Sequence, residues 1–140
     1  MASSSSDPLT GGCGCGAVRF EIRAALGPAR YCHCTRCQRR TGTAASASAA
    51  IVPGSLVVTA GEEHVRGWTP PGGREKAFCE LCGSALFIRD PASGEIAGVR
   101  LGAVDGDPGV RPSARQFVAY AAPWEAIPDD GLARHDERMP

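Results

Sequence analysis

Seven cysteines carry most of the chemistry that this 140-residue sequence offers, and they fall in three short groups. The groups are Cys13 with Cys15, then Cys32, Cys34 and Cys37, and finally Cys79 with Cys82. Two thiolates that lie one or two residues apart can reach the same ion from a tight turn, and this spacing is typical of zinc ligands. Glycines beside the groups favour such turns, because glycine has no Cβ to clash with the folded backbone. We therefore expect all seven cysteines to bind zinc.

A disulfide framework is the competing explanation for so much sulfur. The odd number of cysteines argues against it, because one thiol would stay unpaired. The N-terminal sequence MASSSSDPLT has neither the basic nor the apolar region of a secretory signal. No segment approaches the roughly 18 apolar residues that a membrane span needs. These features predict a cytoplasmic protein without a membrane partner, in a compartment that keeps thiols reduced.

Seven ligands suggest one set of four and one set of three. A structural zinc site has four protein ligands, whereas a catalytic one commonly has three and an open position. The spacing leaves two partitions open: Cys34, Cys37, Cys79 and Cys82 in a ribbon-like set, or Cys13, Cys15, Cys79 and Cys82 beside the local triple Cys32, Cys34 and Cys37. The second is attractive because Cys32 and Cys34 point the same way on an extended chain, and a turn can bring Cys37 back to them.

The elements that position these groups are expected to be short strands. The sequence holds 18 glycines and 11 prolines, and only 6% of its residues are aromatic. Val18, Phe20 and Ile22 alternate with charged residues, which predicts a half-buried strand over 17–22. One helical turn is expected over 36–43, ended by Gly42. Further strands are expected within 44–53, 56–61, 63–68, 74–79, 79–88 after the Cys-x-x-Cys turn, 95–104 and 115–121.

The fold class predicted from these elements is a mostly β, small zinc-stabilised fold with little helix. We expect a disordered leader over 1–10, one zinc-binding domain over 11–131 and a polar tail over 132–140, with Trp124 as the only large anchor near the end. Fifteen basic and fifteen acidic residues give no net charge, so nothing indicates a nucleic-acid partner. No heptad pattern is visible, and the sequence predicts no oligomeric state.

Three motifs, taken together, carry a resemblance to a known family. They are GGCGCGAVRFEI (11–22), CHCTRCQRRTG (32–42) and FCELCGSALF (78–87). In this order they resemble the glutathione-dependent formaldehyde-activating enzyme family, also called the centromere-protein-V-like domain, and the similarity spans about residues 11–131. The resemblance implies an Mss4-like zinc fold. It also implies a structural zinc on Cys13, Cys15, Cys79 and Cys82, and a catalytic zinc on Cys32, Cys34 and Cys37.

The activity that the resemblance implies is that of a carbon–sulfur lyase, which joins glutathione to formaldehyde to give S-hydroxymethylglutathione. Three thiolates around a divalent ion make it a weak activator of water but suit it to hold a fourth thiolate. Such a thiolate stays nucleophilic. Cations that could offset its charge, or bind the carboxylates of a glutathione-like partner, are Arg36, Arg39, Arg40 and Arg74. For each arginine alone, a solvated basic face is the simpler interpretation.

Other residues and other functions stay open at this stage. His33 lies between two ligands, and strand alternation points its side chain away from them, so we expect a surface or packing role. Trp68 and Trp124 are expected to pack in the core or at its rim. A non-catalytic zinc-stabilised binding module would complete the cysteine triple with a nearby side chain. A redox-sensing thiol cluster would release zinc under mild oxidant.

Overall fold

The computed structural model describes residues 7–139 and consists mainly of short strands in two sheets. The small sheet has the order β1-β2-β5 and contains β1 (Leu9–Gly12), β2 (Arg19–Ile22) and β5 (Leu56–Ala60). The large sheet has the order β11-β10-β3-β4-β9-β8-β7-β6. Its strands are β3 (Ala29–Cys32), β4 (Ser46–Ala50), β6 (Val65–Trp68), β7 (Glu75–Cys79), β8 (Ala85–Arg89), β9 (Ile96–Arg100), β10 (Pro112–Gln116) and β11 (Ala133–Arg134).

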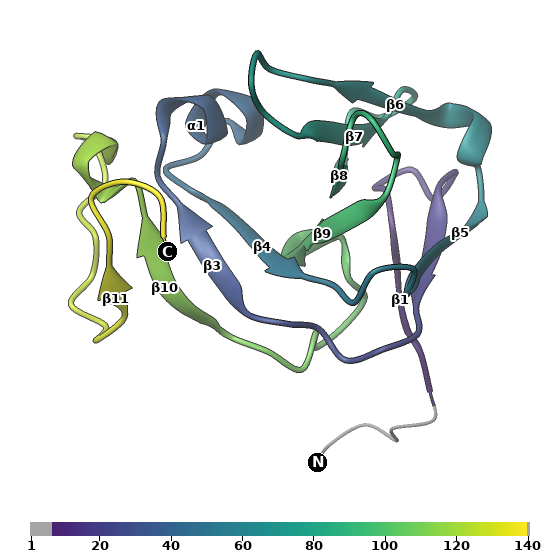
Figure 1. Cartoon of the computed structure of the whole chain (residues 1–140), viewed down its shortest axis with the longest axis horizontal. Coiled ribbons are helices and arrows are strands. Elements are labelled where there is room, and N and C mark those ends of the chain that lie inside the picture. The colour runs from purple at the N-terminus through teal and green to yellow at the C-terminus, as the bar shows by residue number, and fades with distance from the viewer. Residues whose placement is uncertain (1–6, 140) are drawn as a thin grey trace.

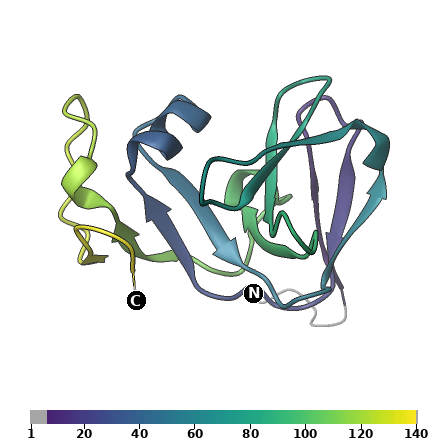
Figure 2. The ribbon, with the colours of Figure 1, turned by 45° about the horizontal axis from the view of Figure 1, so that its top comes forward.

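Helix is scarce in the described part of the chain, which confirms the predicted mostly β fold class. One short α-helix is present, α1 (Thr35–Thr41), with three single 3₁₀ turns, η1 (Glu62–His64), η2 (Leu101–Ala103) and η3 (Val118–Tyr120). Figures 1 and 2 both show α1 beside the β3–β4 pair, with the small sheet on the opposite side of the molecule. None of these helices has the length and apolar character of a membrane span.

The core lies between the two sheets and follows the alternation of the strands. In β2, Phe20 and Ile22 are each 1% exposed, while the intervening charged residues reach the surface. The Phe20 ring meets the Phe87 ring of β8 edge-on, with 6.3 Å between the ring centroids. The strand expected within 17–22 is therefore confirmed, and it packs the small sheet onto the large one.

Strand β3 lies between β4 and β10, antiparallel to the first and parallel to the second. Its last residue, Cys32, is opposite Ser46 of β4 and Gln116 of β10. The chain then turns into α1, which ends at Gly42 in the left-handed conformation, as predicted. Because α1 contains no fully buried residue, polar contacts and the cysteine cluster hold it in place.

Two expectations for the C-terminal part are wrong. Phe117 and Val118 are not at the centre of a strand, because β10 ends at Gln116 and Phe117 has a φ of 58°. The amides of both residues donate to backbone carbonyls of the following C-terminal segment, and these bonds bend the chain away from β10. Trp124 is 66% exposed in a turn outside both sheets, so it is not the buried anchor expected for this segment, and Trp68 is 45% exposed at the edge strand β6.

Short strands also occur where none was expected. β1 begins at Leu9, inside the segment expected as a leader, and pairs with β2. Residues 1–6 of that leader lie outside the described residues. β11 falls within the expected polar tail and pairs in parallel with β10. Both strands are too short, and too poor in alternating apolar residues, to be seen in the sequence pattern.

Candidate metal centres

Four cysteine sulfurs from opposite sides of the core meet in one cluster, the four-sulfur cluster. They belong to Cys13, Cys15, Cys79 and Cys82, and all four Sγ atoms lie within 4.8 Å of one another. Cys13 and Cys15 follow β1 of the small sheet, and Cys79 ends β7 of the large sheet. The Cys15 Sγ lies 3.5 Å from that of Cys13 and 3.9 Å from that of Cys79. The cluster therefore joins the edge strand of the small sheet to β7, the strand next to the edge of the large sheet.

Backbone turns aim these sulfurs at a common centre. Gly16 and Gly83 follow the two cysteine pairs in the left-handed conformation that the predicted turns require. The Val18 amide donates to the Cys13 Sγ at 3.2 Å, which fixes the first turn. In the second turn, the hydroxyl of Ser84 lies 3.1 Å from the Cys82 Sγ, and this hydrogen bond lowers the pKa of Cys82 to about 5.

The other three sulfurs form a separate cluster, the three-sulfur cluster, from one six-residue segment. Cys32 ends β3, Cys34 caps α1, and Cys37 lies in the first turn of α1, with all three Sγ atoms within 4.8 Å of one another. The Cys37 amide donates to the Cys34 Sγ at 3.3 Å. The hydrogen bond between Cys32 and Cys37 lowers the pKa of Cys37 and raises that of Cys32. The fold thus gathers the cysteines as four and three, and not in the ribbon-like set.

The spacing of the sulfurs fits tetrahedral zinc. With Zn–S bonds of about 2.3 Å, tetrahedral geometry places ligand sulfurs about 3.8 Å apart. The two Sγ–Sγ distances of 3.5 and 3.9 Å in the four-sulfur cluster lie close to this value. A disulfide would need about 2.05 Å, and all seven cysteines are free thiols. Thiolates are also ligands that zinc prefers, so the donor set agrees with the geometry.

Two cations near the three-sulfur cluster were missed by the sequence analysis. Arg100 ends β9, is 8% exposed, and donates from Nη1 to the Ser48 hydroxyl at 2.9 Å. Burial lowers the pKa of Arg100, and the charge of Cys37 opposes this shift. Lys76 of β7 is partly buried, and burial and then the charge of Arg100 lower its pKa. For Arg100, the sequence feature that could have indicated this position is a charged residue at the end of a strand of small and apolar residues.

The arginines singled out from the sequence take different positions. Arg40 is partly buried, with its guanidinium 4.8 Å from the centroid of the Phe78 ring. Its Nε and Nη2 atoms are buried without a hydrogen-bond partner. Arg36, Arg39 and Arg74 are exposed, as expected for a solvated basic face.

His33 packs on the side of β3 where β10 lies. It is 3% exposed, and its Nε2 atom lies 3.1 Å from Nη1 of Arg115. Burial, and next the Arg115 charge, lower the pKa of His33. Arg115 also forms an ion pair with Asp130 at 2.7 Å and stacks on the Tyr31 ring at 4.4 Å. The packing role expected for His33 is therefore confirmed.

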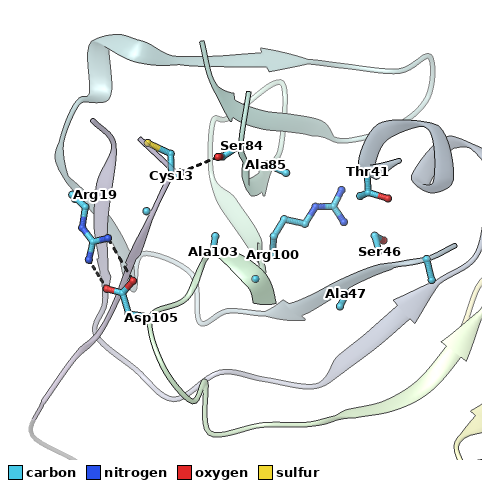
Figure 3. Close-up of a pocket in the computed structure, with 14 residues that line it drawn as sticks. Cys13, Arg19, Thr41, Ser46, Ala47, Ser84, Ala85, Arg100, Ala103 and Asp105 are labelled. Atoms are coloured by element: carbon cyan, nitrogen blue, oxygen red, sulfur yellow. Dashed lines mark hydrogen bonds and ion pairs between the residues drawn. The ribbon is translucent and has the colours of Figure 1, made fainter. Parts of the chain in front are cut away.

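Figure 3 shows the residues that line a pocket of about 490 Å³, which reaches the four-sulfur cluster at Cys13. Thr41, Ser46 and Arg100 line it near the three-sulfur cluster, and Cys13 and Ser84 line it near the other. Ser46 also lies close enough to Cys37 to lower the pKa of its thiol, after the larger effect of Cys32. The pocket has room for a small ligand beside Thr41, Ser46 and Arg100, and none of the cysteines of the three-sulfur cluster lines it.

The fold and the two cysteine clusters define a small β protein with two candidate metal centres, and three comparisons place it among known proteins. Residues 8–120 match the family model described as glutathione-dependent formaldehyde-activating enzyme. A Halomonas elongata protein named "Putative glutathione-dependent formaldehyde-activating enzyme" is 34% identical over 110 residues, which cover 71% of this chain and 67% of that protein. The chain therefore belongs to this family, as the sequence motifs indicated.

A solved structure supports the fold alone. The crystal structure of a Rhodobacter sphaeroides protein superposes with a TM-score of 0.58 at 24% sequence identity. The match covers 90% of this chain and 98% of the other. Nearly the whole of this chain therefore has a counterpart in a known architecture.

Proposed function

We propose that this protein is a zinc-dependent carbon–sulfur lyase that joins a glutathione-like thiol to formaldehyde or a similar small aldehyde. The product would be an S-hydroxymethyl adduct. Family membership supports the choice of glutathione and formaldehyde. The observation that carries the proposal is a cluster of only three sulfurs, separate from a cluster of four and adjacent to a pocket. A three-ligand site leaves one position open for a substrate.

The two clusters would divide the work between stability and chemistry. Cys13, Cys15, Cys79 and Cys82 would hold a structural zinc, and Cys32, Cys34 and Cys37 a catalytic one. When bound at the second site, zinc would favour the thiolate form of a substrate thiol. Arg100 and Lys76 would offset the negative charge that collects there, because both cations lie close enough to Cys37 to interact electrostatically with it.

The reaction needs no oxidant or reductant. The sulfur of the thiol forms a bond to the aldehyde carbon, and the C=O π electrons move onto oxygen. The thiol proton ends on that oxygen, so the adduct contains every atom of the two substrates. The chain would contribute by positioning: Ser46 and Thr41 line the pocket beside Cys37 and would hold the thiol substrate there.

Glutathione binding by the zinc-loaded protein tests the proposal directly. Calorimetric titration should show one saturable site below millimolar thiol, and S-methylglutathione, which has no thiol, should bind at least about tenfold more weakly. Cys37→Ala should abolish binding of glutathione and formation of the S-hydroxymethyl adduct, followed by NMR. Absence of saturable binding at millimolar thiol would reject the proposal. Equal binding by wild type and Cys37→Ala would favour a non-catalytic binding module.

A further inference from the structure

The guanidinium of Arg100 is buried without a carboxylate beside it. Its side chain makes one hydrogen bond to the described residues, from Nη1 to Ser48, and takes part in none of the ion pairs within residues 7–139. A buried cation is costly unless negative or strongly polar groups replace its lost water. One serine hydroxyl does not replace it. The Nε–Nη2 edge of the planar group is therefore available for a ligand.

Two further cations point to the same missing negative charge. Arg40 of α1 and Lys76 of β7 both lie close enough to Arg100 for their charges to act on one another. Neither forms an ion pair with a carboxylate in the described part of the chain. Like charges that gather from three elements repel one another. This repulsion is offset only when negatively charged groups bind between the three side chains.

The three-sulfur cluster supplies part of the negative charge that these three cations need. Three thiolates around a divalent ion leave one negative charge, and a bound substrate thiolate adds a second. The positive charge of Arg40, Lys76 and Arg100, with Arg36 and Arg74 near Lys76, exceeds this negative charge. The region therefore has room for one more anionic group, provided by the substrate itself.

The pocket shows where that group would lie. Arg100 lines the pocket together with Thr41 and Ser46, and Figure 3 shows its side chain extending toward these two residues. The Thr41 hydroxyl also donates to the backbone carbonyl of Cys37 at 2.8 Å, which places the pocket beside the three-sulfur cluster. A ligand whose thiol reaches the three-sulfur cluster can therefore place another part of itself against the guanidinium. Arg100 is a rigid partner for it, because Ser48 on the adjacent strand holds one side of the group.

We propose that Arg100 binds a carboxylate of the thiol substrate through its free Nε–Nη2 edge and so selects peptide thiols over thiols that lack this carboxylate. Two parallel N–H donors match the two oxygens of a carboxylate, and an ammonium group offers no such fork. Arg100 is then a specificity-determining residue, while the three-sulfur cluster and its zinc would hold the sulfur of the substrate. The inference rests on the proposed function, since it takes a glutathione-like thiol as the ligand.

Titration with matched ligands tests this assignment. Glutathione is compared with its glycyl ethyl ester and with 4-aminobutyryl-cysteinyl-glycine, which lacks the α-carboxylate of the γ-glutamyl group. The zinc-loaded wild type should bind glutathione at least about tenfold tighter than one of these two ligands, which identifies the carboxylate. Arg100→Gln should bind glutathione and that ligand within about threefold of each other. Arg111→Gln, which removes an exposed arginine outside the pocket, should keep the wild-type preference.

Several outcomes would overturn the assignment. Arg100→Gln could keep the wild-type preference, or it could lose zinc from the three-sulfur cluster and all thiol binding together, which would limit Arg100 to offsetting the charge of the sulfurs and leave it no role in selecting the thiol. If Arg100→Gln does not fold, Arg100→Lys decides: it keeps the charge without the fork, so the preference should fall at least about threefold. A wild type that binds no glutathione would reject the proposed function itself. A wild type that binds all three ligands equally would reject only the role of Arg100.

Discussion

Single side chains around the cysteines were the hardest feature to foresee. The cysteine spacing predicted zinc ligands, and the fold gathers their sulfurs in the expected sets of four and three. Arg100 and Arg115 carried no comparable signal, because each is one arginine in a strand far from the cysteine motifs. Their importance depends on which strands become neighbours, and β3 pairs with β10 across about 80 residues of sequence. The spacing within a motif can be seen in one short segment, whereas strand pairing depends on residues that are far apart in the sequence.

The ion pair between Arg115 and Asp130 gives a pH-dependent prediction. The hydrogen bond from Arg115 lowers the pKa of Asp130 in the folded protein. A lowered folded pKa means that the pair stabilises the fold fully above the unfolded value of about 3.9 and that this stabilisation is lost as pH falls through the folded pKa. Asp130→Asn should therefore lower the melting temperature at pH 7 by a few degrees, and the difference from wild type should shrink below about pH 4.

Thermal melts of the zinc-loaded proteins, from about pH 8 down to the lowest pH at which both proteins keep their metal, would follow this difference. Asp129→Asn is the matched control, because Asp129 is exposed and forms none of the ion pairs between described residues. A difference between Asp130→Asn and wild type that stays constant down to the lowest pH would show that the ion pair does not stabilise the fold.

At the scale of elements, α1 depends on its polar contacts. A helix of seven residues is marginal on its own, and α1 buries no residue fully. Gln38 links it to its surroundings by donating from Nε2 to the carbonyls of His33 at 2.8 Å and Tyr120 at 2.9 Å. The helix that carries Cys37 is therefore fixed to the residue that follows β3 and to η3 by one amide group.

Gln38→Ala should loosen α1 because it leaves two backbone carbonyls without their donor. We expect a loss of about 1–3 kcal/mol in the free energy of unfolding and faster hydrogen exchange within 35–42. The neighbouring substitution Arg39→Ala removes an exposed side chain and should change stability by less than about 0.5 kcal/mol. Equal exchange rates in the two variants would mean that the cysteine cluster alone holds the helix.

Sequence patterns predicted some elements well and failed where distant segments decide the backbone. The strands within 17–22 and 56–61 and the end of α1 at Gly42 follow from alternation and glycine, which act locally. The strand expected within 115–121 ends early, because the C-terminal segment takes the hydrogen bonds of Phe117 and Val118. β1 was missed because four residues with two glycines show no alternation. Its pairing with β2 creates the strand.

For the molecule as a whole, the two clusters have different structural consequences. The four-sulfur cluster links residues up to 69 positions apart and joins the two sheets, whereas the three-sulfur cluster spans six residues. A structural zinc contributes about 10–16 kcal/mol, which is comparable to or larger than the usual total stability of about 5–15 kcal/mol. The fold should therefore tolerate loss of the second cluster and not of the first.

Cys82→Ala and Cys37→Ala test this difference directly. Cys82→Ala should fail to fold or melt at least about 15 °C below wild type, because the sheets lose their common link. Cys37→Ala should keep its fold, change its melting temperature by no more than a few degrees, and bind one zinc ion per chain where wild type binds two. Metal analysis together with thermal melts provides the measurement. If both variants lose their fold to the same extent, the three-sulfur cluster is a second structural metal site.

The contrast between a local and a distant cluster also determines the order in which the newly made chain can acquire metal. All three sulfurs of the local cluster exist once residue 37 has been translated, but the other cluster has to wait for Cys82. At about 5–20 residues per second, this delay is on the order of 2–9 seconds. During that interval the ribosome-bound chain presents all three sulfurs of the three-sulfur cluster to an arriving ion, and the four-sulfur cluster only in part, before any folded core exists to shield them.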